Sequence, residues 1–160
     1  MNYSNLRTCD VANGPGVRIS LFVSGCRIHC KNCFNQEAQC FAYGKPFTDE
    51  IAQKILTYLE SEYISGLSIL GGEPMEPENA KVLVDLCRMV RKKFGNRKTI
   101  WVWTGYTMER FVGEEYSYQR ELLTLIDCLV DGPFVEELHD ISLVFRGSSN
   151  QRILHKGKDF

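Results

Sequence analysis

One stretch decides the fold of this chain: Val17-Arg18-Ile19-Ser20-Leu21-Phe22-Val23-Ser24-Gly25-Cys26-Arg27-Ile28-His29-Cys30-Lys31-Asn32-Cys33. Its first part is β-branched and apolar, which is the pattern of a buried strand. Ser24-Gly25 ends that strand, and a loop with three cysteines in the spacing C-x3-C-x2-C follows at once. We refer to residues 26–33 as the cysteine loop.

The three cysteines are candidate metal ligands. A four-iron cluster normally takes four cysteines, so Cys26, Cys30 and Cys33 would leave one iron open to a further ligand. Cys30 and Cys33 are equally a zinc half-site, which Cys26, His29 or Cys40 could complete as a tetrahedral set. The spacing alone leaves three alternatives: an open cluster, a structural zinc, and a redox or packed-thiol role.

Composition predicts one cytoplasmic domain over residues 1–160. A hydrophobic content of 44% suffices for a core. The 19 basic and 20 acidic residues give a net charge of -1, which argues against nucleic acid or an anionic membrane as partner. The amino-terminal residues show no signal-peptide pattern, and no stretch approaches the ~20 apolar residues of a membrane span. In a reducing compartment, seven cysteines indicate metal binding or catalysis rather than disulfides.

Strand and helix patterns alternate along the rest of the chain. In chain order we expect a helix capped by Thr48 with an apolar stripe to Leu59, a strand at 67–70, a helix from near Pro77 to Gly95, a strand at 99–103, a helix ending at 122–125, and strands at 126–130 and 141–145. Such alternation predicts a parallel sheet with right-handed crossovers.

The chain is too short for a closed (βα)8 barrel, which needs about 250 residues. We therefore expect an α/β fold, an open partial (βα) barrel of about five to six parallel strands with flanking helices. Sites in such folds lie at the carboxyl ends of the strands. Motifs that directly follow predicted strands should share one face: the cysteine loop, Gly71-Gly72-Glu73-Pro74, Thr104-Gly105-Tyr106, Asp131-Gly132-Pro133-Phe134 and Arg146-Gly147-Ser148-Ser149-Asn150.

The paired glycines Gly71 and Gly72 form a strand exit where the backbone can approach a ligand closely. Such an exit suits the head group of an amino acid. Taken in isolation, Gly71-Gly72-Glu73-Pro74 is equally a tight turn before a helix.

With these two motifs the chain resembles the radical S-adenosylmethionine superfamily, whose members carry C-x3-C-x2-C after the first strand and a GGE-like motif after the second. It is more closely similar to the family of activating proteins of anaerobic (class III) ribonucleoside-triphosphate reductases. That resemblance spans nearly the whole chain and is carried by Asn13-Gly14-Pro15-Gly16-Val17-Arg18, Phe22-Val23-Ser24-Gly25-Cys26, Ile100-Trp101-Val102-Trp103-Thr104-Gly105-Tyr106, Val130-Asp131-Gly132 and Arg146-Gly147-Ser148-Ser149-Asn150-Gln151.

The resemblance implies an iron–sulfur oxidoreductase. Cys26, Cys30 and Cys33 would hold a 4Fe-4S cluster, whose open iron would bind the amino and carboxylate groups of S-adenosylmethionine. One electron, from reduced flavodoxin or a similar donor, would cleave the sulfonium to methionine and a 5′-deoxyadenosyl radical. That radical would take a hydrogen atom from a glycine in the large subunit of the reductase.

The resemblance also implies contacts with S-adenosylmethionine. Gly71, Gly72 and Glu73 would surround the methionyl amino group, the glycines offering backbone bonds. Asn32 and Phe34 would lie against the adenine. Asn32 departs from the aromatic residue common at its position, so we expect its contact through backbone atoms. Phe34 either stacks on the adenine or packs in the core.

Several residues receive weaker assignments. We expect Cys9 and Cys40 to stay outside the cluster, because a three-ligand motif needs its fourth place free. His29 hydrogen-bonds to sulfur or is simply exposed. The basic residues within 88–98 form a solvated helix end or a docking site for an acidic electron donor. The segment 146–151 is a surface turn, or it lines the mouth where a glycine loop of the partner enters.

Two other functions compete with this interpretation. One is an activase for another glycyl-radical enzyme, such as pyruvate formate-lyase, although those relatives tend to have longer chains. The other is a zinc- or cluster-binding interaction module, against which the ordered strand-end motifs argue.

Overall fold

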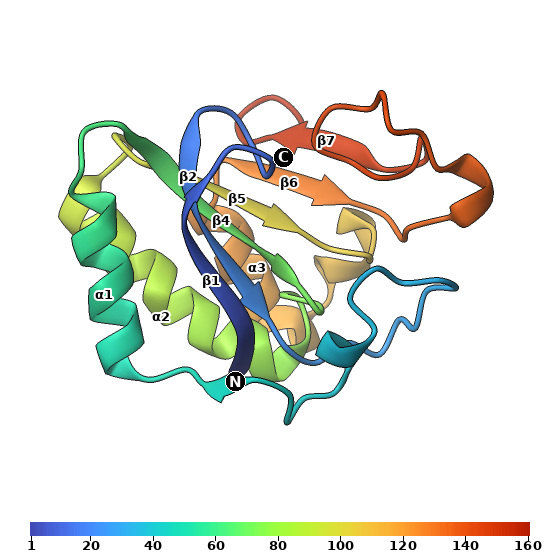
Figure 1. The fold of residues 1–160 in the computed structure, drawn as a ribbon, viewed down its shortest axis with the longest axis horizontal. Helices are drawn as coiled ribbons and strands as arrows, with labels where there is room; N and C mark the ends of the chain where they lie inside the picture. Colours follow the sequence, from blue (N-terminus) through green and yellow to red (C-terminus); the bar gives the residue numbers. More distant parts are fainter.

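A computed structural model describes residues 1–160 and shows an α/β fold built on one seven-stranded sheet (Figure 1). The strands are β1 (Asn2–Asp10), β2 (Val17–Val23), β3 (Lys45–Pro46), β4 (Ile64–Gly71), β5 (Thr99–Trp103), β6 (Cys128–Asp131) and β7 (Arg152–His155). The α-helices are α1 (Asp49–Leu59), α2 (Pro77–Phe94) and α3 (Ser117–Leu125), and the short 3-10 helices are η1 (Glu37–Gln39), η2 (Met108–Val112), η3 (Glu114–Tyr116) and η4 (Glu136–Leu138).

The sheet is mixed, with the order β3-β1-β2-β4-β5-β6-β7. Strands β2, β4, β5 and β6 are parallel, whereas β1, β3 and β7 pair antiparallel with their neighbours. The α/β class is therefore confirmed, but the prediction of five to six parallel strands is wrong. The sheet ends in two edge strands, β3 and β7, and a barrel is not confirmed.

The last strand explains the difference. Between β6 and β7 the chain forms only the short helix η4, so no α-helix returns it to the amino edge of the sheet. Strand β7 therefore starts where β6 ends and runs antiparallel to it. The strand expected at 141–145 is absent. Asp140 Oδ1 instead accepts the Ser142 N–H at 2.8 Å, and Phe145 takes a φ of 59°, so these residues form turns.

The helices form as the sequence predicts. Oγ1 of Thr48 accepts the N–H of Ile51 at the start of α1. Helix α2 begins at Pro77 and ends before Gly95, whose φ of 57° suits a glycine. No helix combines the length and apolar character that crossing a membrane requires.

Two apolar clusters cover the two faces of the sheet. The larger one packs α1, α2 and α3 on one face, against alternating strand residues such as Ile19 and Leu21 of β2. The smaller one, around Trp101, lies on the other face and is covered by Phe145 from the segment after β6. Their rings meet edge to face at 5.5 Å. In Figure 1 the arrowheads of the parallel strands point to one edge, where the cysteine loop and the orange segment after β6 both lie.

Candidate functional site

The strand-end motifs surround one cavity of about 720 Å³. Its lining includes the three cysteines of the cysteine loop, Gly71-Gly72-Glu73 after β4, Thr104-Gly105 after β5, and residues from Gly132 to Gln151 after β6. The prediction that these motifs share one face is thus confirmed. Small-molecule sites typically measure about 300 to 1,000 Å³, so the cavity has the size of a ligand site.

Cys26, Cys30 and Cys33 are each partly buried and line this cavity. Burial is the main cause that raises the pKa of the Cys26 and Cys30 thiols, so both stay protonated until a metal displaces the proton. The structure brings no three His, Cys, Asp or Glu side chains together as a metal-ligand group. The three thiols therefore share a cavity without forming a preassembled ligand set.

Two of the residues offered to complete a zinc site, His29 and Cys40, lie outside the cavity, and so does Cys9. Cys9 and Cys40 are exposed, and neither lines it. His29 is also exposed, and its Nδ1 lies 2.9 Å from Oε1 of Gln39. Neither His29 nor Cys40 therefore completes a tetrahedral zinc site with the three cysteines in this structure.

The start of the cysteine loop is anchored to the exit of β4 by main-chain hydrogen bonds. The N–H of Gly72 donates to Val23 O at 2.7 Å, and that of Glu73 donates to Gly25 O at 2.8 Å. A Cβ at position 72 would lie 2.7 Å from Gly25 O and 2.8 Å from Ala38 O. Packing against the main chain on both sides of the cysteine loop therefore already requires glycine here, whether or not a ligand binds.

Glu73 is a buried carboxylate that connects the exits of β4 and β5. Its Oε1 accepts the Met75 N–H at 2.8 Å and the Thr104 hydroxyl at 2.7 Å, and its Oε2 accepts the Gly105 N–H at 2.8 Å. Burial raises the pKa of Glu73 to about 7, although all three donors favour the ionised form. The side chain thus lines the cavity while its oxygens bond within the protein.

Asn32 and Phe34 lie on the rim of the cavity. Asn32 has a φ of 53°, and its Nδ2 donates to Oε1 of Glu136 at 2.6 Å, across the cavity from the cysteine loop. Lys31 adds contacts to Oε2 of Glu136 at 3.3 Å and to Glu137 at 3.4 Å. Phe34 is 97% exposed, so the alternative that it packs in the core is wrong.

The segment 146–151 lines the cavity and is held by Gln151. Oε1 of Gln151 accepts the N–H groups of Gly147 at 2.8 Å and Ser148 at 3.1 Å, while its Nε2 donates to Gly132 O at 3.0 Å. The segment is therefore part of the cavity wall and not an isolated surface turn.

Comparison with known proteins agrees with this geometry. A family model described as a 4Fe-4S single cluster domain matches residues 12–154. A curated protein of Haemophilus influenzae named anaerobic ribonucleoside-triphosphate reductase-activating protein is 42% identical over 160 residues, which cover 99% of each chain. Proteins of the same name from Vibrio cholerae (42%, 98% of each chain) and Escherichia coli K12 (40%, 97% of this chain and 99% of that one) also match.

The chain belongs to the family of anaerobic ribonucleoside-triphosphate reductase-activating proteins. This activating protein contains a 4Fe-4S cluster domain, and the cysteine loop lies within the matched residues. The match favours an iron–sulfur cluster over structural zinc.

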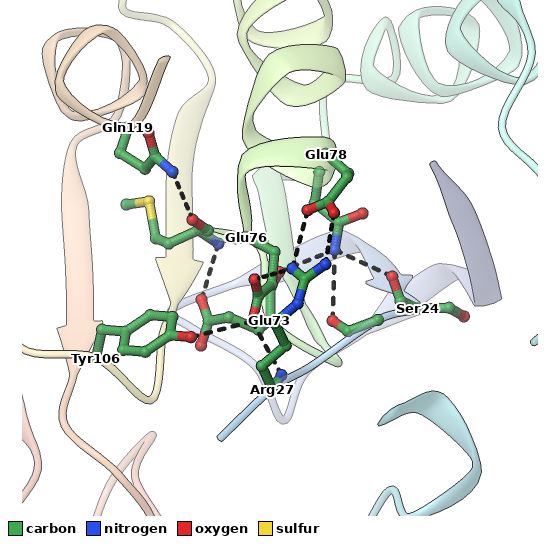
Figure 2. Close-up of polar contacts among 10 residues, drawn as sticks. Ser24, Arg27, Glu73, Glu76, Glu78, Tyr106 and Gln119 are labelled. Carbon is green, nitrogen blue, oxygen red and sulfur yellow. Dashed lines mark hydrogen bonds and ion pairs between the residues drawn. The ribbon is translucent and has the colours of Figure 1, made fainter. Parts of the chain in front are cut away.

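Sequence reasoning missed Glu76, which precedes α2 and contacts the cysteine loop. Its carboxylate is 2% exposed and accepts the main-chain N–H of Arg27 at 2.9 Å and the Tyr106 hydroxyl at 3.0 Å (Figure 2). Arg27 and Glu76 are 49 positions apart, and no local pattern joins them. The only available signal is an arginine directly after the first cysteine and a glutamate directly before the predicted helix that begins at Pro77.

The basic residues at the end of α2 are not a uniformly solvated surface. Nη2 of Arg91 contacts Asp127 at 2.6 Å, and Nζ of Lys98 donates to Ile64 O at 2.5 Å and Ser61 O at 2.9 Å. These residues precede β5 and so lie at the amino edge of the parallel strands, opposite the cavity. An electron donor docked there would be separated from the cysteine loop by the length of the parallel strands.

Proposed function

We propose that the chain activates anaerobic ribonucleoside-triphosphate reductase by reductive cleavage of S-adenosylmethionine. In this proposal Cys26, Cys30 and Cys33 hold a 4Fe-4S cluster with its fourth iron open. The observation that carries it is the shared cavity, which the three cysteines and the paired glycines both line. When bound there, the cluster supplies an electron and an open iron for the methionyl group.

The chain's own groups bind and orient the substrate. The N–H of Gly72 is already bonded to Val23 O, whereas the carbonyl of Gly72 accepts no hydrogen bond from the protein. That carbonyl is suited to the ammonium of the methionyl group. In this proposal the adenine contacts backbone atoms of Asn32 and the exposed ring of Phe34, both of which lie on the rim of the cavity. Fixing both ends holds the sulfonium in a reactive position.

The reaction balances with one external electron. A low-potential one-electron donor, such as reduced flavodoxin, supplies it, and the bond between sulfur and C5′ breaks to give methionine and a 5′-deoxyadenosyl radical. The radical removes one hydrogen atom from a glycine Cα of the large subunit. The products are 5′-deoxyadenosine and a glycyl radical on the reductase.

Exposed apolar side chains beside the cavity support a protein substrate. Ile141 is 92% exposed, Val144 is 62% exposed and Leu138 is 43% exposed, while their neighbours Leu143 and Phe145 line the cavity. Contiguous exposed apolar side chains commonly mark protein contacts. A partner loop that entered here would cover these residues and exclude water from the radical.

Anaerobic reconstitution tests the proposal. We expect about four irons and four sulfides per chain, and one methionine per 5′-deoxyadenosine when reductant and S-adenosylmethionine are added. Cys30→Ala should abolish the cleavage, whereas the matched Cys40→Ala, at an exposed thiol outside the cavity, should retain the cluster. Stoichiometric zinc without sulfide in protein purified without air would overturn the proposal.

A partner assay separates this function from its nearest rival. With the large chain of the cognate reductase, we expect a glycyl-type doublet in the electron paramagnetic resonance spectrum. No signal on that chain, together with a normal signal on pyruvate formate-lyase, would assign the protein to another glycyl-radical enzyme.

A further inference from the structure

We infer that Glu76 is a positioning residue for the cysteine loop, acting through the main chain of Arg27. The inference rests on the proposed function, because the loop it fixes carries the three proposed cluster ligands. Oε1 of Glu76 accepts the Arg27 N–H at 2.9 Å, and Oε2 accepts Nη1 of the same arginine at 2.5 Å. Arg27 directly follows Cys26, so this contact fixes the loop beside the first ligand.

The hydrogen bond from the Arg27 N–H to Glu76 has no equivalent among the next residues of the cysteine loop. Between Arg27 and Asn32, the Arg27 N–H is the only main-chain N–H that donates a hydrogen bond to a group outside the loop. At the ends of the loop, Cys26 N–H donates to Gln39 O at 3.0 Å and Cys33 N–H donates to Cys30 O at 3.2 Å. Without Glu76, the chain after Cys26 would have no such main-chain anchor to the rest of the fold.

Glu76 is itself held by hydrogen bonds to other parts of the fold (Figure 2). Its main-chain carbonyl accepts the N–H groups of Asn79 at 2.9 Å and Ala80 at 2.8 Å, which places it at the first turn of α2, where the helix dipole favours a negative charge. The Tyr106 hydroxyl donates to Oε1 at 3.0 Å from the exit of β5. The carboxylate therefore connects the helix, the sheet and the cysteine loop.

Glu78 provides an internal control. Its carboxylate also pairs with Arg27, at 2.6 Å from Nη2 and 3.0 Å from Nη1, but it contacts only the guanidinium and is half exposed. The same guanidinium lies 4.3 Å from the centre of the Phe41 ring. Removing Glu78 weakens the side-chain contact and leaves the main-chain contact of Glu76 intact.

The test compares Glu76→Ala, Glu76→Gln, Glu78→Ala and Arg27→Ala in the full chain. Hydrogen exchange of residues 26–33 is measured before cluster assembly, and the rate of iron loss to a chelator is measured afterwards. Loss of groups that orient metal ligands typically lowers metal affinity about 10- to 100-fold. We expect iron loss to accelerate by about that factor in Glu76→Ala, with loss of protection at the Arg27 amide.

The effect of each other variant should depend on which contacts of the cysteine loop it keeps. Glu76→Gln keeps an acceptor oxygen and should partly restore protection. Arg27→Ala keeps the main-chain N–H, so its rate of iron loss should be closer to that of Glu78→Ala. We expect the rate in Glu78→Ala to stay within about twofold of the wild-type rate, since exposed ion pairs contribute little.

Two results would overturn the inference. One is equal loop exchange and equal iron loss in Glu76→Ala and Glu78→Ala. The other is a Glu76→Ala or Glu76→Gln protein in which amides of β4 and β5 lose as much protection as the loop, which would indicate a general structural role. A wild-type chain that binds no cluster would instead refute the proposed function, while the exchange data would still decide whether Glu76 anchors the loop.

Discussion

Nε of Arg18 donates a hydrogen bond to Oγ of Ser68 at 2.6 Å, on the face of the sheet opposite the helices. The Ser68 hydroxyl in turn donates to Asn13 O at 2.5 Å, and Asn13 lines the cavity. Arg18 is fully buried without a carboxylate partner, and its Nη2 donates to the carbonyls of Leu67 at 2.8 Å and Thr99 at 3.0 Å. Burial lowers the pKa of Arg18 to about 10. The guanidinium therefore connects three parallel strands to the loop that borders the cavity.

Replacing Arg18 with lysine should destabilise the fold. A lysine ammonium cannot reach the acceptors that the guanidinium spans, so buried carbonyls would lose their donors. We expect Arg18→Lys to lower the free energy of unfolding by about 3 kcal/mol, measured by urea denaturation of the metal-free protein. Arg7→Lys, on the exposed part of β1, should stay within about 0.5 kcal/mol. Equal small losses in the two variants would contradict this role for Arg18.

The pKa of Glu73 predicts a pH-dependent stability. Because burial raises its pKa from 4.5 to about 7 in the folded state, its contribution is fully present below pH 4.5 and is lost as the pH rises through 7. The contribution of Glu73 to the free energy of unfolding should fall by roughly 2 to 3 kcal/mol between about pH 5 and pH 8.

Urea denaturation of the metal-free wild type and of Glu73→Gln measures this contribution. The glutamine variant cannot ionise, so the difference in unfolding free energy between the two proteins should change across that pH interval. A difference that stays constant with pH would show that Glu73 titrates normally, with its three donors offsetting burial.

The sequence predicted the elements whose signals are local. Buried apolar runs identified β2, β4, β5 and β6, and end signals located α1 and α2. The cysteine loop and the paired glycines were expected on one face because parallel strands deliver their carboxyl ends to one edge, and the structure shows that both line one cavity.

What sequence reasoning missed depends on long-range contacts. Strand β1 is largely polar and exposed, and it forms by antiparallel pairing with the adjacent strand β2. The apolar residues 141–145 resembled a strand, yet Ile141 and Val144 face solvent, where a partner can reach them. The contact of Glu76 with Arg27 spans 49 positions, and no periodicity encodes it.

A substitution at Gly72 tests how tightly the exit of β4 packs against the neighbouring main chain. Since a Cβ there would meet the backbone oxygens of Gly25 and Ala38, Gly72→Ala should displace the start of the cysteine loop and lower the free energy of unfolding by about 1 to 3 kcal/mol. Gly147 also lines the cavity, and a Cβ there would meet the Phe134 side chain at 3.2 Å. Gly147→Ala should therefore lower the free energy of unfolding by less than Gly72→Ala. Thermal denaturation of the metal-free proteins compares them. Wild-type stability in Gly72→Ala would show that the neighbouring main chain adjusts, and would contradict the packing requirement at this position.

Phe34 offers a test of how the rim of the cavity is used. Its ring is 97% exposed, so Phe34→Ala should leave the free energy of unfolding almost unchanged. Stacking of an aromatic ring on a base contributes about 1 to 3 kcal/mol. If Phe34 stacks on the adenine, its removal should raise the KM for S-adenosylmethionine about 5- to 150-fold, in a cleavage assay without the reductase.

Tyr63 supplies the matched control for Phe34. It is 68% exposed and directly precedes β4, at the amino edge of the sheet and away from the cavity, so Tyr63→Ala should leave that KM unchanged. A second assay, with the large chain of the reductase, separates the two uses of the ring. If Phe34→Ala keeps the wild-type KM for S-adenosylmethionine but needs more reductase to form the glycyl radical, then Phe34 contacts the partner and not the adenine.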